Sequence, residues 1–314
     1  MDSFDLQKLA ERTRAMREGG IALILASGLL GLFLLIPSAT PRPEPVAVAT
    51  TPAAPNAFAD VPIEAMAAIV YDLATGETLY AKNPDAQLPL ASLTKLLTVY
   101  AALATLPLDT PVTISADATH LDMPRAFSEG QTFALDDLAR LTLTASLNDG
   151  ATAIAEVAAA HQNRSPHELL SGAAAALRLS QTYAVNGSGL DVTTAVSGGY
   201  GSARDLARLA GALAAQAPAI AGATTRSSAQ AVSEGGTIFV VENTDPIVNT
   251  VPHLLLSKTG FTDLAGGNVA LVFDVGIGHP IAIVVLGSSR DARFTDGSAL
   301  IAATLAHFAG VQSL

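Results

Sequence analysis

Cysteine and tryptophan are absent from this 314-residue chain, and aromatic residues make up only 5% of it. Without cysteine, a disulfide framework, a thiolate metal site and a cysteine nucleophile are all excluded. Scarce aromatics leave little material for stacking against sugars or bases. The net charge of −11 disfavours a nucleic-acid partner, because neutralising phosphates requires a basic surface. Half of the residues are apolar, which is enough to form the core of one large domain or two small ones.

An uninterrupted apolar run extends over residues 19–36. As a helix it would span roughly 27 Å, close to the hydrocarbon thickness of a bilayer. Basic residues cluster before it, whereas only Arg42 follows before Lys82. The positive-inside rule therefore predicts a cytoplasmic segment over residues 1–18 and a transmembrane helix over 19–36. A cleaved signal peptide is the alternative, and in both cases the rest of the chain works outside the cytoplasm. The predicted location is thus the cell membrane, with a single pass and a periplasmic globular part.

Residues 37–60 are rich in proline, alanine and threonine and have no apolar periodicity. This composition is typical of an extended linker that holds a domain away from the membrane. A globular domain is predicted over residues 61–314.

Strand patterns occur near both ends of this domain, with a helical region between them. A hairpin is predicted at residues 67–71 and 78–81, and helices dominate residues 134–215, with capping motifs at Ser165 and Ser202. Later strands are predicted at 237–241, 254–261, 268–275 and 280–287, followed by a helix at 297–308. Because strands must pair, we predict an α+β fold, with an antiparallel sheet formed from both chain ends, flanking helices and an inserted helical subdomain.

Ser92 and Lys95 stand one turn apart at the start of a predicted helix, in the sequence Ser-Leu-Thr-Lys. Residues at this spacing share a helix face, so the lysine can reach the serine hydroxyl. A serine becomes a good nucleophile when a base takes its proton, and a lysine can be that base when desolvation favours its neutral form. The chain has four lysines against thirteen arginines, yet both Lys95 and Lys258 fall in candidate motifs.

Two further motifs follow in the chain. Ser146-Leu147-Asn148 stands at a predicted break between helices, where its side chains could relay a proton and bind a substrate amide. Lys258-Thr259-Gly260 lies on a predicted strand, where a cation and a hydroxyl could hold a terminal carboxylate. Each motif alone also fits an ordinary structural role, as a capped helix turn in the first case and a strand end in the second.

In this order, the three motifs are the set shared by penicillin-binding proteins and class A β-lactamases. Longer segments resemble the low-molecular-weight penicillin-binding proteins of the D-alanyl-D-alanine carboxypeptidase family, the S11 type of serine peptidase. The segments that carry this resemblance are Pro89–Thr98, Ser146–Ala151, Gly201–Ala207 and Lys258–Gly266. The resemblance covers nearly all of residues 61–314 and implies a β-lactamase/D,D-peptidase-like fold.

The resemblance also implies a catalytic role for four residues. Ser92 would be acylated with Lys95 as its base, and Ser146 and Asn148 would serve the proton relay and contact the substrate. No metal or cofactor is required, and the six histidines show no metal-ligand spacing.

The substrate-binding residues implied by the resemblance lie on the predicted strand. Lys258 and Thr259 would bind the terminal D-Ala carboxylate, and Gly260 would let the substrate backbone approach the strand. The backbone N–H groups of Phe261 and Ser92 would form the oxyanion hole.

The function implied is a serine-type D-Ala-D-Ala carboxypeptidase that trims peptidoglycan stem pentapeptides, with β-lactams as covalent inhibitors. A D,D-endopeptidase that cleaves cross-links is the alternative. A β-lactamase is disfavoured because no Glu-x-x-Leu-Asn element lies between Asn148 and Lys258. A non-catalytic wall-binding protein is disfavoured because Ser92, Lys95 and Lys258 are all present.

The sequence departs from the family pattern in a few places. The segment Asn186–Leu190 lacks the usual proline, and we expect it to contact no catalytic group. Ser257 precedes Lys258 where a small or aliphatic residue is common. We expect no counterpart of the C-terminal β-rich domain of many relatives, and the last helix, without lysine or arginine, is expected to pack on the sheet.

Overall fold

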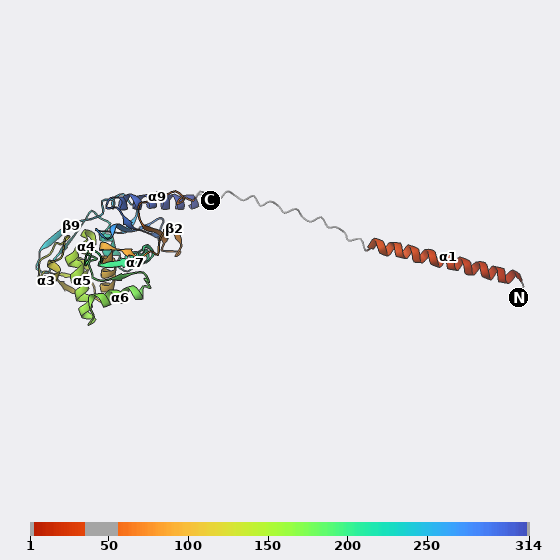
Figure 1. Cartoon of the computed structure of the whole chain (residues 1–314), viewed down its shortest axis with the longest axis horizontal. Coiled ribbons are helices and arrows are strands. Elements are labelled where there is room, and N and C mark those ends of the chain that lie inside the picture. The colour runs from red at the N-terminus through yellow and green to blue at the C-terminus, as the bar shows by residue number, and fades with distance from the viewer. Residues whose placement is uncertain (1–2, 35–55, 313–314) are drawn as a thin grey trace. The chain divides into compact units, whose positions relative to one another are not determined.

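A computed structural model describes residues 3–34 and 56–312, and the chain divides into two compact units, Met1–Ala53 and Ala54–Leu314 (Figure 1). The first unit contains helix α1 (Ser3–Leu34), which begins well before the predicted span. Among the described residues, α1 holds the one helical segment that is long and apolar enough to cross a membrane, Gln7–Leu32. Residues 37–55 of the predicted linker lie outside the described part of the chain.

The second unit begins with a turn in which Phe58 is buried against Tyr80 and His307. Its elements, in chain order, are β1 (Ala67–Asp72), β2 (Thr78–Lys82), β3 (Leu88–Pro89), the 3-10 helix η1 (Ala91–Leu93), α2 (Thr94–Leu103), β4 (Pro111–Thr113), α3 (Ala116–Thr119), β5 (Thr132–Ala134), α4 (Leu135–Ala145), α5 (Asn148–His161), α6 (Pro166–Ala176), β6 (Tyr183–Ala184), β7 (Gly199–Gly201), α7 (Ala203–Gln216), α8 (Pro218–Ala223), β8 (Ser228–Val232), β9 (Ile238–Glu242), β10 (Leu254–Thr262), β11 (Gly266–Asp274), β12 (Pro280–Ser288) and α9 (Ala292–Gln312).

The main sheet is antiparallel and has the strand order β10-β11-β12-β1-β2. Strands from the two ends of the unit meet where β1 pairs with β12, for example Ile69 opposite Val284. The predicted α+β fold with a sheet formed from both chain ends is therefore confirmed. The strand predicted at 237–241 also exists as β9, but it pairs with β8 in a separate hairpin. The sequence pattern did not predict β8.

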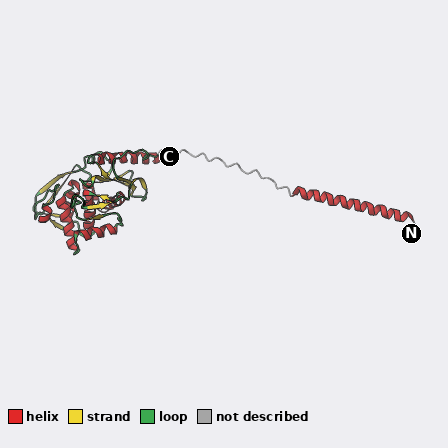
Figure 2. Cartoon of the chain, viewed as in Figure 1, coloured by secondary structure: helices red, strands yellow, loops and turns green. Residues whose placement is uncertain are grey.

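Helices cover both faces of this sheet. Along β1, Ala67 and Ile69 belong to a core cluster that includes α7 residues, whereas Ala68 and Val70 belong to a second cluster with Leu300 of α9. Figure 2 shows the strands lying between helices. Burial of both faces explains why the strands read as continuous apolar runs instead of alternating. The prediction that the last helix packs on the sheet is confirmed, because α9 contacts β11 and β12.

The inserted helical subdomain contains α4, α5 and α6, which gather on the side of the unit away from α9 (Figure 1). Helix α5 packs against α2, α4 and α6. Its alanines let the helix backbones approach closely, which is how an alanine-rich segment builds a core. Helix α6 begins with the predicted capping box, in which Ser165 and Glu168 bond each other's backbone N–H groups.

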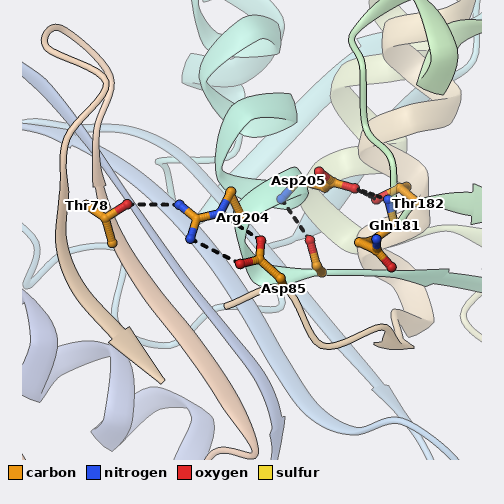
Figure 3. Close-up of polar contacts among 7 residues, drawn as sticks. Thr78, Asp85, Gln181, Thr182, Arg204 and Asp205 are labelled. Carbon is orange, nitrogen blue, oxygen red and sulfur yellow. Dashed lines mark hydrogen bonds and ion pairs between the residues drawn. The ribbon is translucent and has the colours of Figure 1, made fainter. Parts of the chain in front are cut away.

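The capping motif at the start of α7 differs from the predicted reciprocal box. Ser202 accepts a hydrogen bond from the Asp205 backbone N–H at 3.2 Å. The Asp205 carboxylate turns away from the cap and accepts from the Gln181 N–H at 2.8 Å and the Thr182 hydroxyl at 3.0 Å (Figure 3). The first turn of α7 thus holds the segment before β6 instead of completing its own cap.

Arg204, the neighbouring residue, connects α7 to the other side of the fold. Its guanidinium pairs with Asp85 at 2.7 Å and donates to the Thr78 hydroxyl of β2 at 2.9 Å (Figure 3). Adjacent side chains of α7 therefore hold the β2 edge of the main sheet and the segment before β6.

Candidate active site

Ser92 lies in η1, immediately before α2, and is partly exposed. The tight turn at this point depends on Gly189, whose φ of +78° is in the left-handed region. A Cβ at position 189 would lie 2.0 Å from the carbonyl oxygen of Ala91, so only glycine fits beneath the turn. The loop that carries Gly189 thus shapes the segment that presents Ser92.

The Lys95 amine lies 2.7 Å from the Ser92 hydroxyl oxygen and is completely buried. It also donates to the side-chain oxygen of Asn148 and the backbone oxygen of Ser188, both at 2.7 Å. Because a carbonyl oxygen can only accept, these two partners match the two N–H groups of a neutral amine. The remaining lone pair then faces the Ser92 hydroxyl, which is the arrangement a general base requires.

The electrostatic surroundings favour that neutral amine. Burial lowers the pKa of Lys95 well below its ordinary value, and the positive charge of Lys258 lowers it further. The carboxylate of Asp149 acts in the opposite direction without reversing the effect. The geometry and the lowered pKa together indicate a base.

Ser146 and Asn148 occupy the junction between α4 and α5, as the sequence predicted. Ser146 is the C-cap of α4 and adopts a left-handed φ of 60°, a conformation in which helices often end. Asn148 donates its side-chain N–H to the backbone oxygen of Asp122 at 2.9 Å. Its side-chain oxygen is thereby oriented toward Lys95.

Lys258 lies on β10, one of the two edge strands of the main sheet, and its side chain is buried. Its amine donates to the Ser146 hydroxyl at 2.9 Å and to the Thr259 backbone oxygen at 2.7 Å. Burial, together with the nearby charge of Arg293, lowers the pKa of Lys258 to about 7, and Asp245 opposes this shift. The hydrogen bond from Lys258 thus connects β10 to Ser146 at the junction of α4 and α5.

The rest of the Lys-Thr-Gly motif follows the strand past the serine. The hydroxyl of Thr259 lies 2.6 Å from that of Thr244. A Cβ at Gly260 would lie 3.2 Å from the Ser92 backbone nitrogen, which shows how closely β10 passes the turn. The Phe261 ring is partly exposed and lies beneath Arg290, whose guanidinium carbon is 4.0 Å from the ring centroid.

The structure thus gathers the predicted residues around one junction of α2, α5 and β10. The expectation that Asn186–Leu190 contacts no catalytic group is wrong, because the Ser188 carbonyl binds Lys95. A backbone carbonyl leaves no side-chain signal in the sequence, which is why this contact was missed.

The sequence also did not indicate Thr244, Asp245 and Arg293, which surround the motif strand. Arg293 donates to the Gly260 carbonyl at 2.6 Å, and the hydroxyl of Ser257 donates to Asp245. The one available signal in the sequence was Ser257, which is unusual for the family at this position. Its hydroxyl binds the buried carboxylate of Asp245 behind β10. Within residues 3–34 and 56–312, no group of three or more histidine, aspartate or glutamate side chains is arranged to hold a metal ion.

This fold defines a class, the penicillin-binding proteins and D,D-peptidases. The structure is similar to a D-alanyl-D-alanine carboxypeptidase from Mycobacterium tuberculosis, with a TM-score of 0.69 and 23% identity over 79% of this chain and 94% of that one. It is also similar to penicillin-binding protein D2 from Listeria monocytogenes, with a TM-score of 0.66 and 26% identity over 78% of this chain and 98% of that one.

The sequence identifies the family within that class. The sequence profile of the S11 peptidase family, D-alanyl-D-alanine carboxypeptidase, matches residues 49–290, and the chain belongs to this family. It is 32% identical over 241 residues to a D-alanyl-D-alanine endopeptidase of Pseudomonas aeruginosa, covering 74% of each protein. It is 30% identical over 282 residues to a D-alanyl-D-alanine endopeptidase of Escherichia coli, covering 86% of this chain and 85% of that protein. The chain is therefore a serine D-Ala-D-Ala peptidase.

Proposed function

We propose that this protein removes the terminal D-alanine from peptidoglycan stem pentapeptides through an acyl-Ser92 intermediate. The observation that carries the proposal is the buried Lys95 amine, 2.7 Å from the Ser92 hydroxyl, with its other partners both acceptors. A neutral amine held in this way can take the serine proton as the hydroxyl oxygen attacks.

In the acylation step, Ser92 attacks the carbonyl carbon of the penultimate D-alanine while Lys95 accepts its proton. The oxyanion that forms accepts hydrogen bonds from the backbone N–H groups of Ser92 and Phe261, which the close passage of β10 supports. The C–N bond breaks as the proton that Lys95 took from Ser92 passes through the Ser146 hydroxyl to the leaving nitrogen, which departs as the amine of D-alanine and leaves Lys95 neutral again. Lys258, which donates to the Ser146 hydroxyl at 2.9 Å, keeps its proton in this step. Water then attacks the ester while Lys95 takes a proton from it, and that proton passes to the Ser92 oxygen as the ester C–O bond breaks.

Lys258 and Thr259 hold the carboxylate of the leaving D-alanine in this proposal. The Thr259 hydroxyl is oriented by Thr244, at 2.6 Å, and Lys258 is held by Ser146. Asn148 lies at the other end of the site, where its amide can bind the substrate's acyl portion.

Cleavage of D,D cross-links is the second candidate, favoured by the two endopeptidase relatives. A carboxylate site does not discriminate between the two reactions. When a cross-link runs through the D-centre of a diaminopimelate residue, that centre carries a carboxylate at the same position relative to the scissile bond. The same Lys258 and Thr259 would then bind an internal carboxylate instead of a terminal one.

We also propose that β-lactams acylate Ser92, since the Listeria monocytogenes relative has been solved in ampicillin-bound and cefotaxime-bound forms. The membrane-length helix in α1 supports a single-pass anchor, with residues 1–18 cytoplasmic and residues 61–314 as a periplasmic catalytic domain. In this arrangement the catalytic unit is held on the side of the membrane where peptidoglycan lies.

The test incubates the full-length chain, in detergent, with isolated muropeptides and analyses the products by mass spectrometry. We expect pentapeptides to lose one alanine, and Ser92→Ala to abolish the reaction. Lys95→Arg should lower the rate by about a hundredfold or more, because arginine stays protonated and cannot act as the base. Lys82→Arg is the matched control, since Lys82 lies outside the site and donates to the Ile63 carbonyl.

Each alternative has its own result in this assay. Cleaved cross-links with intact pentapeptides would identify an endopeptidase. No product of either kind from a folded chain would overturn the proposed reaction, and full activity of Lys95→Arg would overturn the role given to the lysine.

A further inference from the structure

A small sheet lies directly before the nucleophile in the chain. Its three strands have the order β3-β7-β6, and β3 ends at Pro89, three residues ahead of Ser92. In the pairing register Pro89 lies opposite Tyr200, and Tyr200 lies opposite Tyr183. Residues that lie opposite each other in antiparallel strands project from the same face. These three side chains, the Pro-Tyr-Tyr row, therefore cross one face of the small sheet.

The two tyrosines of this row are stacked and accessible. Their ring centroids lie 5.3 Å apart, with 21° between the ring planes. Tyr183 is 39% exposed, and Tyr200 is partly exposed. Because β6 is an outer strand, the ring face of Tyr183 that turns away from Tyr200 also turns away from the sheet. Two of the five tyrosines in a chain with few aromatic residues are thus gathered at one surface.

Hydrogen bonds hold the row in place. The hydroxyl of Tyr200 accepts from the Ser197 backbone N–H at 2.9 Å. The two residues immediately before Tyr183 both donate to the buried carboxylate of Asp205 (Figure 3). A rigid aromatic surface loses little conformational entropy when a ligand binds to it. The fold therefore pre-organises the row for binding.

The row suits the rings of uncharged sugars. A pyranose ring presents a face of C–H groups, which packs against the electron-rich face of an aromatic ring. None of the three side chains of the row carries a charge. Three strands at about 4.8 Å between neighbours make the row about 10 Å wide, close to the length of a disaccharide. An exposed apolar row of this kind is typical of a binding surface.

The distance from the row to the nucleophile matches the length of the stem peptide. Pro89 and Ser92 are three residues apart, so their Cα atoms are separated by about 11 Å at most. The fourth stem residue carries the scissile carbonyl, and four extended residues span about 14 Å. The sugar to which the stem is attached can therefore reach the row while the scissile bond is at Ser92.

We propose that the Pro-Tyr-Tyr row is a subsite for the N-acetylated disaccharide that carries the stem peptide. This proposal rests on the proposed function and adds the glycan strand to the substrate that the site recognises. Tyr183 is the specificity-determining residue, because its ring is the most exposed of the row. The protein should then prefer stem peptides that are still attached to the wall over free peptides.

The test compares two substrates with the same pentapeptide. One is attached to its N-acetylglucosamine–N-acetylmuramic acid disaccharide, and the other keeps only the lactyl group, so the charges of the two peptides are the same. For the full-length chain in detergent, we expect kcat/KM to be about tenfold higher for the disaccharide pentapeptide, through a lower KM. In Tyr183→Ala this ratio should fall to about twofold, whereas Tyr183→Phe, which keeps the ring, should retain it.

Ile277→Ala is the matched control. Ile277 is a fully exposed apolar residue in the turn between β11 and β12, outside the small sheet. Its removal should leave the tenfold ratio unchanged. Melting temperatures close to that of the unmodified chain establish that the variants fold.

The outcomes separate the subsite from the reaction itself. Equal kcat/KM values for the two substrates, or an unchanged ratio in Tyr183→Ala, would overturn the subsite while leaving the D,D-peptidase intact. If the chain cleaves cross-links instead, the same comparison with cross-linked dimers, with and without their sugars, decides in the same way. Failure to hydrolyse any of these substrates, together with failure of Ser92 to be labelled by a fluorescent penicillin, would overturn both proposals.

Discussion

At the residue scale, the site sets opposite requirements for two buried lysines. In the proposed mechanism, Lys95 must be neutral to accept a proton, whereas Lys258 must be protonated to hold a carboxylate. Both have lowered pKa values because both are buried. The positive charge of Lys258 is itself one cause of the low pKa of Lys95, so the protonated form of Lys258 favours the neutral form of Lys95.

The pH dependence of the reaction follows from Lys258. Its pKa in the free protein is about 7, so the protonated fraction falls as the pH rises through that value. We expect kcat/KM, which reports groups of the free enzyme, to fall on the alkaline side of about pH 7. The buried carboxylate of Asp245 raises the pKa of Lys258, so Asp245→Asn should move this alkaline limb to lower pH.

The measurement is kcat/KM for a pentapeptide between pH 5 and pH 10, with concentrations chosen to separate KM from kcat. Asp263→Asn is the control, because this exposed carboxylate follows β10 directly. An Asp245→Asn profile that coincides with that of the unmodified chain would refute the assigned influence of Asp245.

At the element scale, the start of α7 shows that adjacent polar residues can differ in what they contribute. Asp205 is buried and accepts from two donors, whereas Arg204 pairs with Asp85, whose side chain is 62% exposed (Figure 3). Water screens the interaction between Arg204 and Asp85, whereas the hydrogen bonds of the buried Asp205 are not screened. The carboxylate of Asp205 should therefore contribute more to the free energy of unfolding than the salt bridge between Arg204 and Asp85.

We expect Asp205→Ala to lower the free energy of unfolding by about 2 kcal/mol or more, because the Gln181 N–H and the Thr182 hydroxyl lose their acceptor. Arg204→Ala should lower it by about 0.5 kcal/mol. Urea unfolding of the two variants under one set of conditions provides the comparison. Equal losses, or a larger loss for Arg204→Ala, would contradict the ranking.

At the scale of the whole molecule, the chain joins a membrane-length helix to a compact enzyme. The segment Gln7–Leu32 is lipid-compatible by length and composition. The unit from Ala54 onward has its own core, built on the main sheet. Because each unit is compact by itself, anchoring and catalysis should be separable.

We expect a chain that lacks residues 1–53 to leave the membrane fraction, because the apolar helix that prefers the bilayer is gone. It should keep the melting temperature of the catalytic unit and the labelling of Ser92 by a fluorescent penicillin. Cell fractionation and thermal unfolding measure these properties, and the same truncation with Ser92→Ala is the unlabelled control. Retention of the truncated chain on membranes would assign membrane binding to the catalytic unit.

The sequence by itself determined the order of the main helices and strands and identified the motif residues on which the proposed chemistry rests. The hairpin of β1 and β2, the strands β10, β11 and β12, and the helical insertion follow from apolar periodicity and turn residues, which are local properties. The motif residues could be identified because their side chains carry the chemistry and their spacing is short. Ser92 and Lys95, for example, share a helix face because they are three residues apart, a spacing that can be read directly from the sequence.

Tertiary structure alone decided the contacts made by groups far apart in the chain or by the backbone. The Ser188 carbonyl on Lys95, the pairing of Thr244 with Thr259, and the buried Asp245 behind β10 have no local signature. The low pKa of Lys258 also required the fold, because it depends on burial and on Arg293, 35 residues later in the sequence. Local sequence specifies which groups are available, whereas desolvation and long-range packing determine their protonation states and partners.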